Sequence, residues 1–232
     1  MSFLLDFISE AQSDTSLKVL LRKMKVLGSF TGAQELKEWA HQELVGYGPD
    51  AAIPDYRGPF PIVVLGHFAG PFNMNAKNVH IPPMTFPESF RDSPLFNFTC
   101  TQGIAEVEEL ASEDFREFGW LSDYLMFYNT MVQSGQISPV MQNGFSLVGA
   151  KWTVSRHIFE GILENVRNKA LDLALELHDS APNAGQPDAD DSTKEEAAQT
   201  INNFFTQNFH FNNVDMSGAN NAMGSSGFEQ SE

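Results

Sequence analysis

Apolar residues recur along the chain with two periods, and the change from one to the other predicts the order of the elements. Between residues 14 and 28, leucine and methionine return every three or four positions, which is typical of one buried helix face. Residues 33–45 repeat this period and stop at Gly46. Because the connection between them is short, the two segments predict an antiparallel helical hairpin, with Gly28 ending its first helix.

The middle of the chain changes to the period of strands. Four prolines between residues 49 and 61 exclude a continuing helix. The apolar segment 61–68 is β-branched at its centre and predicts a strand, and 78–83 predicts a second extended segment. Residues 145–154 alternate apolar and polar positions and predict a third strand.

Three further segments carry helical or mixed patterns. Residues 104–112 place apolar side chains on one helical face, whereas 118–132 is apolar on nearly every side and fits either a buried helix or a pair of strands. Residues 156–178 keep the helical period for about six turns. We therefore expect an α+β fold, with an N-terminal helical hairpin, a small mostly antiparallel sheet and a long C-terminal helix packed on it.

The segment after the long helix predicts no core of its own. Residues 180–199 hold no apolar side chain larger than alanine and have the composition of a flexible acidic linker, with a short helix at 193–199. Residues 200–232 are rich in asparagine and phenylalanine, and about the last ten are expected to be disordered. The expected domains are thus 1–179, the linker 180–199 and the tail 200–232.

Phenylalanines in this tail alternate with polar residues, as they do in a strand. A lone strand leaves its backbone groups unpaired, so we expect the tails of several copies to pair and form a homo-oligomer. Such pairing would raise the effective concentration of the preceding domains. The alternative is a disordered tail with an adhesive patch. The expected oligomerisation residues are Ile201, Phe204, Phe205, Phe209, Phe211 and Val214.

Composition is that of a globular protein, with 42% apolar residues. No apolar run approaches the ~18 to 20 residues of a membrane span, and the first twelve residues hold acidic side chains where a signal peptide is basic. These features predict a cytoplasmic protein without a membrane partner. The single cysteine, Cys100, excludes an intrachain disulfide and fits a small buried residue.

A net charge of −16 disfavours nucleic acid as a partner, because an acidic surface repels phosphates. Residues 1–179 contribute −9 of this charge and residues 180–232 contribute −7. One basic cluster stands out, and we interpret it as the solvated face of a helix. It consists of Lys18, Arg22, Lys23 and Lys25.

At residues 20–60 the sequence LLRKMKVLGSFTGAQELKEWAHQELVGYGPDAAIPDYRGPF resembles the opening of the AbiTii family. The turn GHFAGPF, the segment GIAEVEEL and the helix IFEGILENVRNKALDLALEL follow in the order of that family, so the resemblance covers residues 1 to about 179. It implies a bacterial antiphage role of the abortive-infection type, that of a growth-arresting toxin. It implies no known catalytic mechanism.

The densest polar triplet within this resemblance is Asp55, Tyr56 and Arg57. An arginine after a proline-fixed turn can hold a phosphate or a carboxylate in bidentate fashion. Tyr56 and Arg57 are therefore candidate binding residues, and Asp55 and Arg57 are candidate catalytic residues. The alternative is that Asp55 and Arg57 form internal hydrogen bonds that fix the loop.

Arg167 and Asn168 suggest a second catalytic chemistry. They resemble the start of the Arg-Asn-x-x-x-His motif that one class of defence ribonucleases carries on a helix, where His is the acid or base. Asp172 stands in the place of that His, which argues against ribonuclease activity. We expect Arg167 to lie on the polar face of the helix and to reach an acidic neighbour, Glu160 or Glu164.

No metal or cofactor site is expected. His67 and His80 lie in or near neighbouring predicted strands and would give two ligands, but no third ligand is evident, so core or surface histidines are expected instead. The local signatures of nucleotide hydrolysis, serine hydrolases and zinc proteases are absent from the sequence.

The favoured function is an antiphage defence protein of bacteria, a growth-arresting effector that self-assembles through its tail. One alternative is a non-catalytic sensor or scaffold that binds a phage protein or another protein partner. A second alternative is a nuclease-like enzyme that uses Arg57, Arg167 or a pair of histidines.

Overall fold

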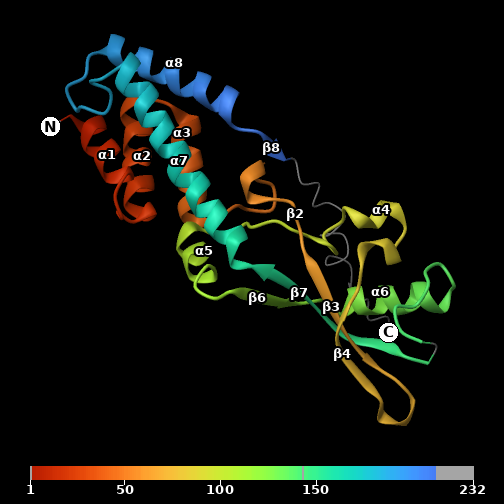
Figure 1. The fold of residues 1–232 in the computed structure, drawn as a ribbon. Helices are drawn as coiled ribbons and strands as arrows, with labels where there is room; N and C mark the ends of the chain where they lie inside the picture. Colours follow the sequence, from red (N-terminus) through yellow and green to blue (C-terminus); the bar gives the residue numbers. More distant parts are fainter. Residues whose placement is uncertain (1, 143, 213–232) are drawn as a thin grey trace, which may run out of the picture. The chain divides into compact units, whose positions relative to one another are not determined.

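The computed structural model describes residues 2–142 and 144–212, and it has the predicted α+β fold with small antiparallel sheets (Figure 1). Its chain divides into two compact units. Unit 1 takes in residues up to 55, residues 101–104 and the chain from 167 onward, and unit 2 takes in 56–100 and 105–166. No helix in the described part of the chain is both long and apolar enough to cross a membrane.

Unit 1 begins with three helices, α1 (Phe3–Ala11), α2 (Leu17–Thr31) and α3 (Gln34–Val45). Helices α2 and α3 are the predicted hairpin, but the prediction that Gly28 ends α2 is wrong. A Cβ at Gly28 would lie 2.9 Å from the backbone N of Lys37, so this glycine lets α3 pass close to α2. Helix α2 ends instead at Gly32, whose φ of 74° is the left-handed conformation that glycine adopts readily.

Helix α7 (Arg156–Ser180) is the predicted long helix, but only its first part packs with the sheet. Phe159 and Ile162 are fully buried in a cluster of unit 2 that includes Val154 of the sheet. From Arg167 onward the helix belongs to unit 1, where Ala170, Leu173, Ala174 and Leu177 form its buried face. The predicted packing of this helix on the sheet is confirmed for its first part, and its second half is buried in the largely helical unit 1.

The segment after α7 differs from the expected linker and strand. Residues 191–208 form helix α8 (Asp191–Asn208), and the carboxylate of Asp190 caps it by accepting the N–H of Thr193 at 2.7 Å. This hydrogen bond holds the pKa of the Asp190 carboxyl below its ordinary value. The tail phenylalanines fit a helical period as well as an alternating one, and burial on one helix face decides for the helix. That buried face carries Ala197, Ile201, Phe204 and Phe205.

The small residues of the expected linker are part of the fold. Ala181 and Ala184 are buried, and a Cβ at Gly185 would lie 2.7 Å from a ring carbon of Phe3. The lack of large side chains, which predicts a flexible segment, instead allows close packing here. Beyond α8, strand β8 (Phe211–Asn212) pairs antiparallel with β1 (Ile53–Pro54). The division into domains at 179 and 199 stays a prediction.

Unit 2 is built around a four-stranded antiparallel sheet in the order β4-β3-β7-β6 (Figure 1). The three segments with strand patterns correspond to β3, β4 and β7. Residues 118–132, which fitted either a helix or strands, divide between the end of β6 and helix α6 (Ser122–Gln133). The strands are β3 (Val63–Ala69), β4 (Asn75–His80), β6 (Phe115–Gly119) and β7 (Ser146–Ser155).

Shorter elements complete the chain. Strand β2 (Phe60–Pro61) pairs antiparallel with β5 (Asn97–Phe98). The short helices are α4 (Glu88–Arg91) and α5 (Ile104–Leu110), and the single helical turns are η1 (Asp55–Arg57), η2 (Pro71–Asn73) and η3 (Pro83–Thr85).

The two faces of the four-stranded sheet have different environments within unit 2. On one face, Val64 and Phe68 of β3 are buried in a cluster that includes Tyr128 of α6. Residues that alternate with these positions stay accessible, and Val63 and Phe115 are 48% and 60% exposed. We call this second side of the sheet the open face.

Candidate functional site

Arg57, a candidate for both binding and catalysis, is fully buried in unit 2. Its Nη1 donates to the carbonyl oxygen of Cys100 at 3.1 Å and lies 3.9 Å from the cysteine sulfur. In return, the backbone N–H of Cys100 donates to the carbonyl oxygen of Arg57 at 2.8 Å. The guanidinium thus joins two segments of the unit, and no surface of this side chain is left for a ligand from solvent.

Arg167 also forms structural hydrogen bonds, in unit 1. Its guanidinium donates to three carbonyl oxygens, those of Ala11, Ser13 and Thr15, at 3.3, 3.2 and 2.8 Å. These oxygens belong to the end of α1 and to the loop before α2. Carbonyls at a helix end have no partner within the helix, so Arg167 satisfies acceptors that the fold leaves open. The acidic neighbour expected from the sequence is not among these partners.

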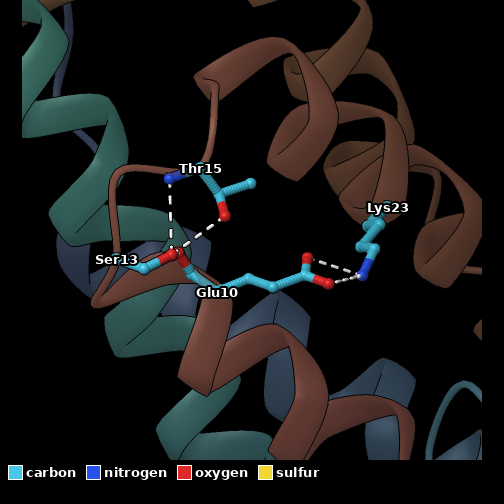
Figure 2. Close-up of polar contacts among 4 residues, drawn as sticks. All are labelled: Glu10, Ser13, Thr15 and Lys23. Carbon is cyan, nitrogen blue, oxygen red and sulfur yellow. Dashed lines mark hydrogen bonds and ion pairs between the residues drawn. The ribbon is translucent and has the colours of Figure 1, made fainter.

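Figure 2 shows polar side chains of this loop, Ser13 and Thr15, together with Glu10 of α1 and Lys23 of α2. The hydroxyl of Ser13 donates to the carbonyl oxygen of Glu10 at 2.8 Å and accepts the backbone N–H of Thr15 at 3.3 Å. The ammonium of Lys23 lies 2.6 Å from both carboxylate oxygens of Glu10. The loop is therefore held both by its own side chains and by Arg167.

The remaining candidates do not form a constellation with these arginines. Asp55 is exposed, and its backbone N–H donates to the carbonyl oxygen of His210 at 2.9 Å. Tyr56 is 8% exposed, and Asn168 is exposed on α7. Among the described residues of unit 1, no hydrogen bond or ion pair joins Asp55 or Asn168 to Arg167.

The residues expected to drive oligomerisation are largely buried within unit 1. Phe205 and Phe209 stack with ring centroids 4.4 Å apart, and both approach Trp39 edge-on, at 6.0 and 5.5 Å. The ammonium of Lys169 lies 4.6 Å from the ring centroid of Phe209. Of the others, Ile201 and Phe204 are buried, Phe211 is 46% exposed, and Val214 lies outside the described residues.

The open face of the sheet carries a hollow of about 290 Å³. Gly149 of β7 leaves its floor uncovered, because a Cβ there would meet only the Cβ of His67, at 3.8 Å. The polar side chains that line it come from three adjacent strands: His67 from β3, Lys77 and Asn78 from β4, and Lys151 from β7.

Two irregularities of the sheet meet at His67. Toward β4, the pairing shifts next to His67, so Lys77 and Asn78 together stand opposite one residue of β3. Toward β7, the pairing shifts at the same place and leaves Val148 without a match. Bulges bend a strand and redirect its side chains, and they are over-represented beside functional sites. Asn78 has a φ of 56°, a left-handed conformation that asparagine adopts more readily than most residues.

Cationic groups surround the hollow. Lys77 is exposed, and no described residue forms an ion pair or hydrogen bond with its ammonium. The ammonium of Lys151 lies 2.7 Å from a carboxylate oxygen of Glu117, with the two side chains 31% and 52% exposed. Nε2 of His67 lies 3.2 Å from Oδ1 of Asn75. An exposed ion pair of this kind is weak, so Lys151 remains available to an anion that competes with Glu117.

The sequence pattern suggested His67 as a metal ligand with His80 or as a core or surface histidine, and it gave no indication of Lys77 or Lys151. Between residues 2 and 212, leaving out 143, no group of three or more His, Cys, Asp or Glu side chains could hold a metal ion. The available signals were Gly66 and Gly149, because glycine inside a strand pattern marks a bulge or a close approach.

The turn that joins β3 to β4 is unusual. The N–H of Met74 donates to the carbonyl oxygen of Pro71 at 3.1 Å, and the residues between them, Phe72 and Asn73, have φ of 55° and 60°. Two successive positive φ values define a type I′ turn, which favours asparagine and glycine. Phe72 is 98% exposed, so its ring gains no packing in return for the strained backbone.

Antiparallel sheets, a helical hairpin and a long helix define an α+β protein whose open sheet face holds the candidate site. The chain belongs to the AbiTii family, whose model matches residues 3–203. This confirms the family prediction and implies a defence protein of the abortive-infection type. The match extends past residue 179 into α8. Nothing among the curated proteins and nothing among the solved structures matches the chain.

Proposed function

We propose that this AbiTii protein is a growth-arresting effector of abortive infection that acts by binding a ligand, and that the hollow on the open face is its binding site. The observation that carries the proposal is the pair of bulges that meet at His67. They bring Lys77 and Asn78 to one side of the hollow, with Lys151 on another strand. Sheet irregularities at one point, combined with polar groups around a concave surface, are typical of a binding site.

The positions of the candidate residues favour a binding protein over a nuclease. The nuclease alternative uses Arg57, Arg167 or a pair of histidines, and both arginine guanidiniums donate to backbone carbonyls. Arg57 has no exposed surface. A nuclease needs an acid or base within reach of its substrate, together with a charge that stabilises the transition state. The proposal therefore assigns these arginines to the fold.

The experiment that tests this proposal fills the hollow. Gly149→Val places methyl groups over the floor, where the Cβ has room, and valine is well suited to a strand. Gly119→Val is the control, because Gly119 lies on β6 outside the hollow and a Cβ there meets nothing within 4 Å. Plaque counts are compared on cells that carry each variant.

We expect Gly149→Val to lose protection and Gly119→Val to keep it, with equal amounts of folded protein. Full protection by Gly149→Val and by Lys77→Ala would overturn the proposal. Induction without phage separates effector from sensor: an effector arrests growth when overproduced, whereas a sensor or scaffold that only binds a phage protein leaves growth unchanged.

Self-assembly through the tail stays a prediction, and the packing of unit 1 limits the residues that could mediate it. Phe205 and Phe209 already contact Trp39, so assembly would rest on Phe211 and on the chain beyond it. Light scattering on the full chain and on Phe211→Asp tests this. A defined oligomer that becomes a monomer in the variant supports tail assembly, and equal masses contradict a role for Phe211.

A further inference from the structure

We infer that the hollow binds the phosphate group of a small phosphorylated molecule, an inference that rests on the proposed binding site and adds its ligand class. Two of the 14 lysine and arginine residues of the chain line this one hollow. The ammonium of Lys77 has no partner among the described residues, which makes it available to an anion. Charge-assisted hydrogen bonds from lysine to phosphate are among the stronger polar contacts in proteins.

Asn75 determines which ring nitrogen of His67 is available to the ligand. The Nδ2 of Asn75 donates to the carbonyl oxygen of Asn73 at 2.9 Å, which turns its Oδ1 toward His67. Since Oδ1 is an acceptor, Nε2 of His67 carries the proton and donates to it. Nδ1 is then left for the ligand: it accepts from a phosphate hydroxyl when the ring is neutral and donates to a phosphate oxygen when the ring is charged.

The size of the hollow limits the ligand. Sites that enclose a whole small molecule occupy about 300 to 1,000 Å³, and this hollow of about 290 Å³ lies at the lower end of that range. It holds a phosphate and the atoms next to it, while the rest of the molecule extends over the open face. A chain of net charge −16 repels a nucleic-acid polyanion along its whole length, which favours a small ligand over DNA or RNA.

Glu117 opposes anion binding at the same site. Its carboxylate contacts the ammonium of Lys151 at 2.7 Å, and a phosphate that reaches Lys151 must share or displace this partner. If the hollow binds phosphate, removal of the Glu117 carboxylate should therefore strengthen ligand binding. Glu117→Gln keeps the size of the side chain and removes its charge.

The test is calorimetric titration of the full chain with inorganic phosphate and, separately, with ATP, at constant ionic strength and with sodium chloride as the control anion. We expect binding of at least one phosphate probe. Lys77→Ala combined with Lys151→Ala should weaken it about tenfold or more, and Glu117→Gln should strengthen it about threefold. Lys194→Ala, which removes an exposed lysine paired with Asp191 on α8, is the matched control and should leave it unchanged.

Two results would overturn the inference: no binding of either probe, or equal binding by the wild type and by the double lysine variant. Binding of ATP without binding of inorganic phosphate supports it and shows that atoms beyond the phosphate contribute. The plaque assay with Gly149→Val separates this inference from the proposed function. Lost protection without phosphate binding removes only the ligand class, whereas phosphate binding with full protection removes the proposed function.

Discussion

The loop between α1 and α2 in unit 1 and the hollow in unit 2 use cationic side chains in different ways. At the loop, Arg167 donates to three backbone carbonyls, and beside it Lys23 of α2 pairs with Glu10 of α1. In the hollow, Lys77 has no partner in the described chain, and Lys151 shares one exposed carboxylate. The first arrangement stabilises a fold, whereas the second contributes little to stability and leaves charge available.

This difference shows why residue type alone misleads. Arginine is the usual side chain for bidentate recognition of phosphate and carboxylate, which made Arg57 a candidate, whereas Arg167 was a candidate because of its likeness to a ribonuclease motif. The same forked donors also satisfy backbone carbonyls, and burial decides between the two uses. The comparison predicts that substitutions of the arginines act on stability, whereas substitutions of the lysines act on binding.

The largest effect is expected for Arg57→Ala, which extends the comparison to a fully buried guanidinium. The substitution removes the donor to the carbonyl of Cys100 and leaves a cavity, so the free energy of unfolding should fall by about 3 kcal/mol or more. Urea denaturation measures this. Arg57→Lys should recover only part of the loss, because an ammonium lacks the planar fork. Wild-type stability in Arg57→Ala would contradict a structural role.

Arg167→Ala should lower the free energy of unfolding by about 2 kcal/mol, because carbonyls of the α1–α2 loop lose a charged donor. The control is Arg156→Ala, whose exposed ion pairs with Asp114 and Glu160 should contribute less than about 1 kcal/mol. Equal losses in the two variants would mean that the loop contacts of Arg167 add nothing. Phosphate titration should be unchanged in both.

Phe72→Gly should raise the stability by about 0.5 to 1 kcal/mol, since glycine avoids the cost of a left-handed residue and loses only part of that gain to the greater freedom of the unfolded chain. The change tests whether strain in the β3–β4 turn is real. Thermal unfolding of Phe72→Gly beside Phe72→Ala decides it, because alanine removes the ring and keeps the strain. Equal midpoints in the two variants would contradict the prediction.

Lys77→Ala should change the stability by less than about 0.5 kcal/mol while it weakens phosphate binding. The arginine substitutions test the effect on stability, and this lysine substitution tests the opposite expectation for the hollow. Urea denaturation and calorimetric titration are run on the same preparation. A large loss of stability would show that Lys77, like Arg167, has a structural role.

The smallest effect concerns acid stability. The hydrogen bond from Thr193 lowers the pKa of Asp190 in the folded chain, so its stabilisation is complete above the ordinary aspartate pKa and is lost as pH falls through the lowered folded value. Asp190→Asn keeps the helix cap and removes the titration. Between neutral pH and pH ~3, the urea midpoint should fall less in Asp190→Asn than in the wild type, and an equal fall in both would contradict the prediction.

Helices and strands in which apolar residues recur with a regular period were predictable from the sequence. They include α2, α3, β3, β7 and α7. The end of α2 was not predictable, because sequence cannot show that Gly28 faces the backbone of α3 and Gly32 adopts a left-handed φ. Of helix α8 only the short helix at 193–199 was predicted, and the rest was mistaken for linker and strand for a related reason. The structure of this segment depends on contacts with residues distant in the sequence, such as those of its phenylalanines with Trp39.

The candidate site was harder to predict than the fold. The hollow depends on two register shifts at His67, and a shift has no periodic signature because the residues on either side of it still alternate. Lys77 and Lys151 lie far apart in the sequence, and they line the same hollow because their strands, β4 and β7, both pair with β3. The sequence signal for this place is limited to Gly66 and Gly149, two glycines within strand patterns.

The turn at Phe72 also bears on which changes in length the protein can tolerate. Because side chains alternate along a strand, one residue inserted between Ala69 and Lys77 would move Lys77 to the opposite side of the sheet. Proteins that share the hollow should therefore vary freely in the identity of residue 72 and hardly at all in the number of residues between β3 and Lys77. Insertions should collect instead in loops whose length sets no strand register.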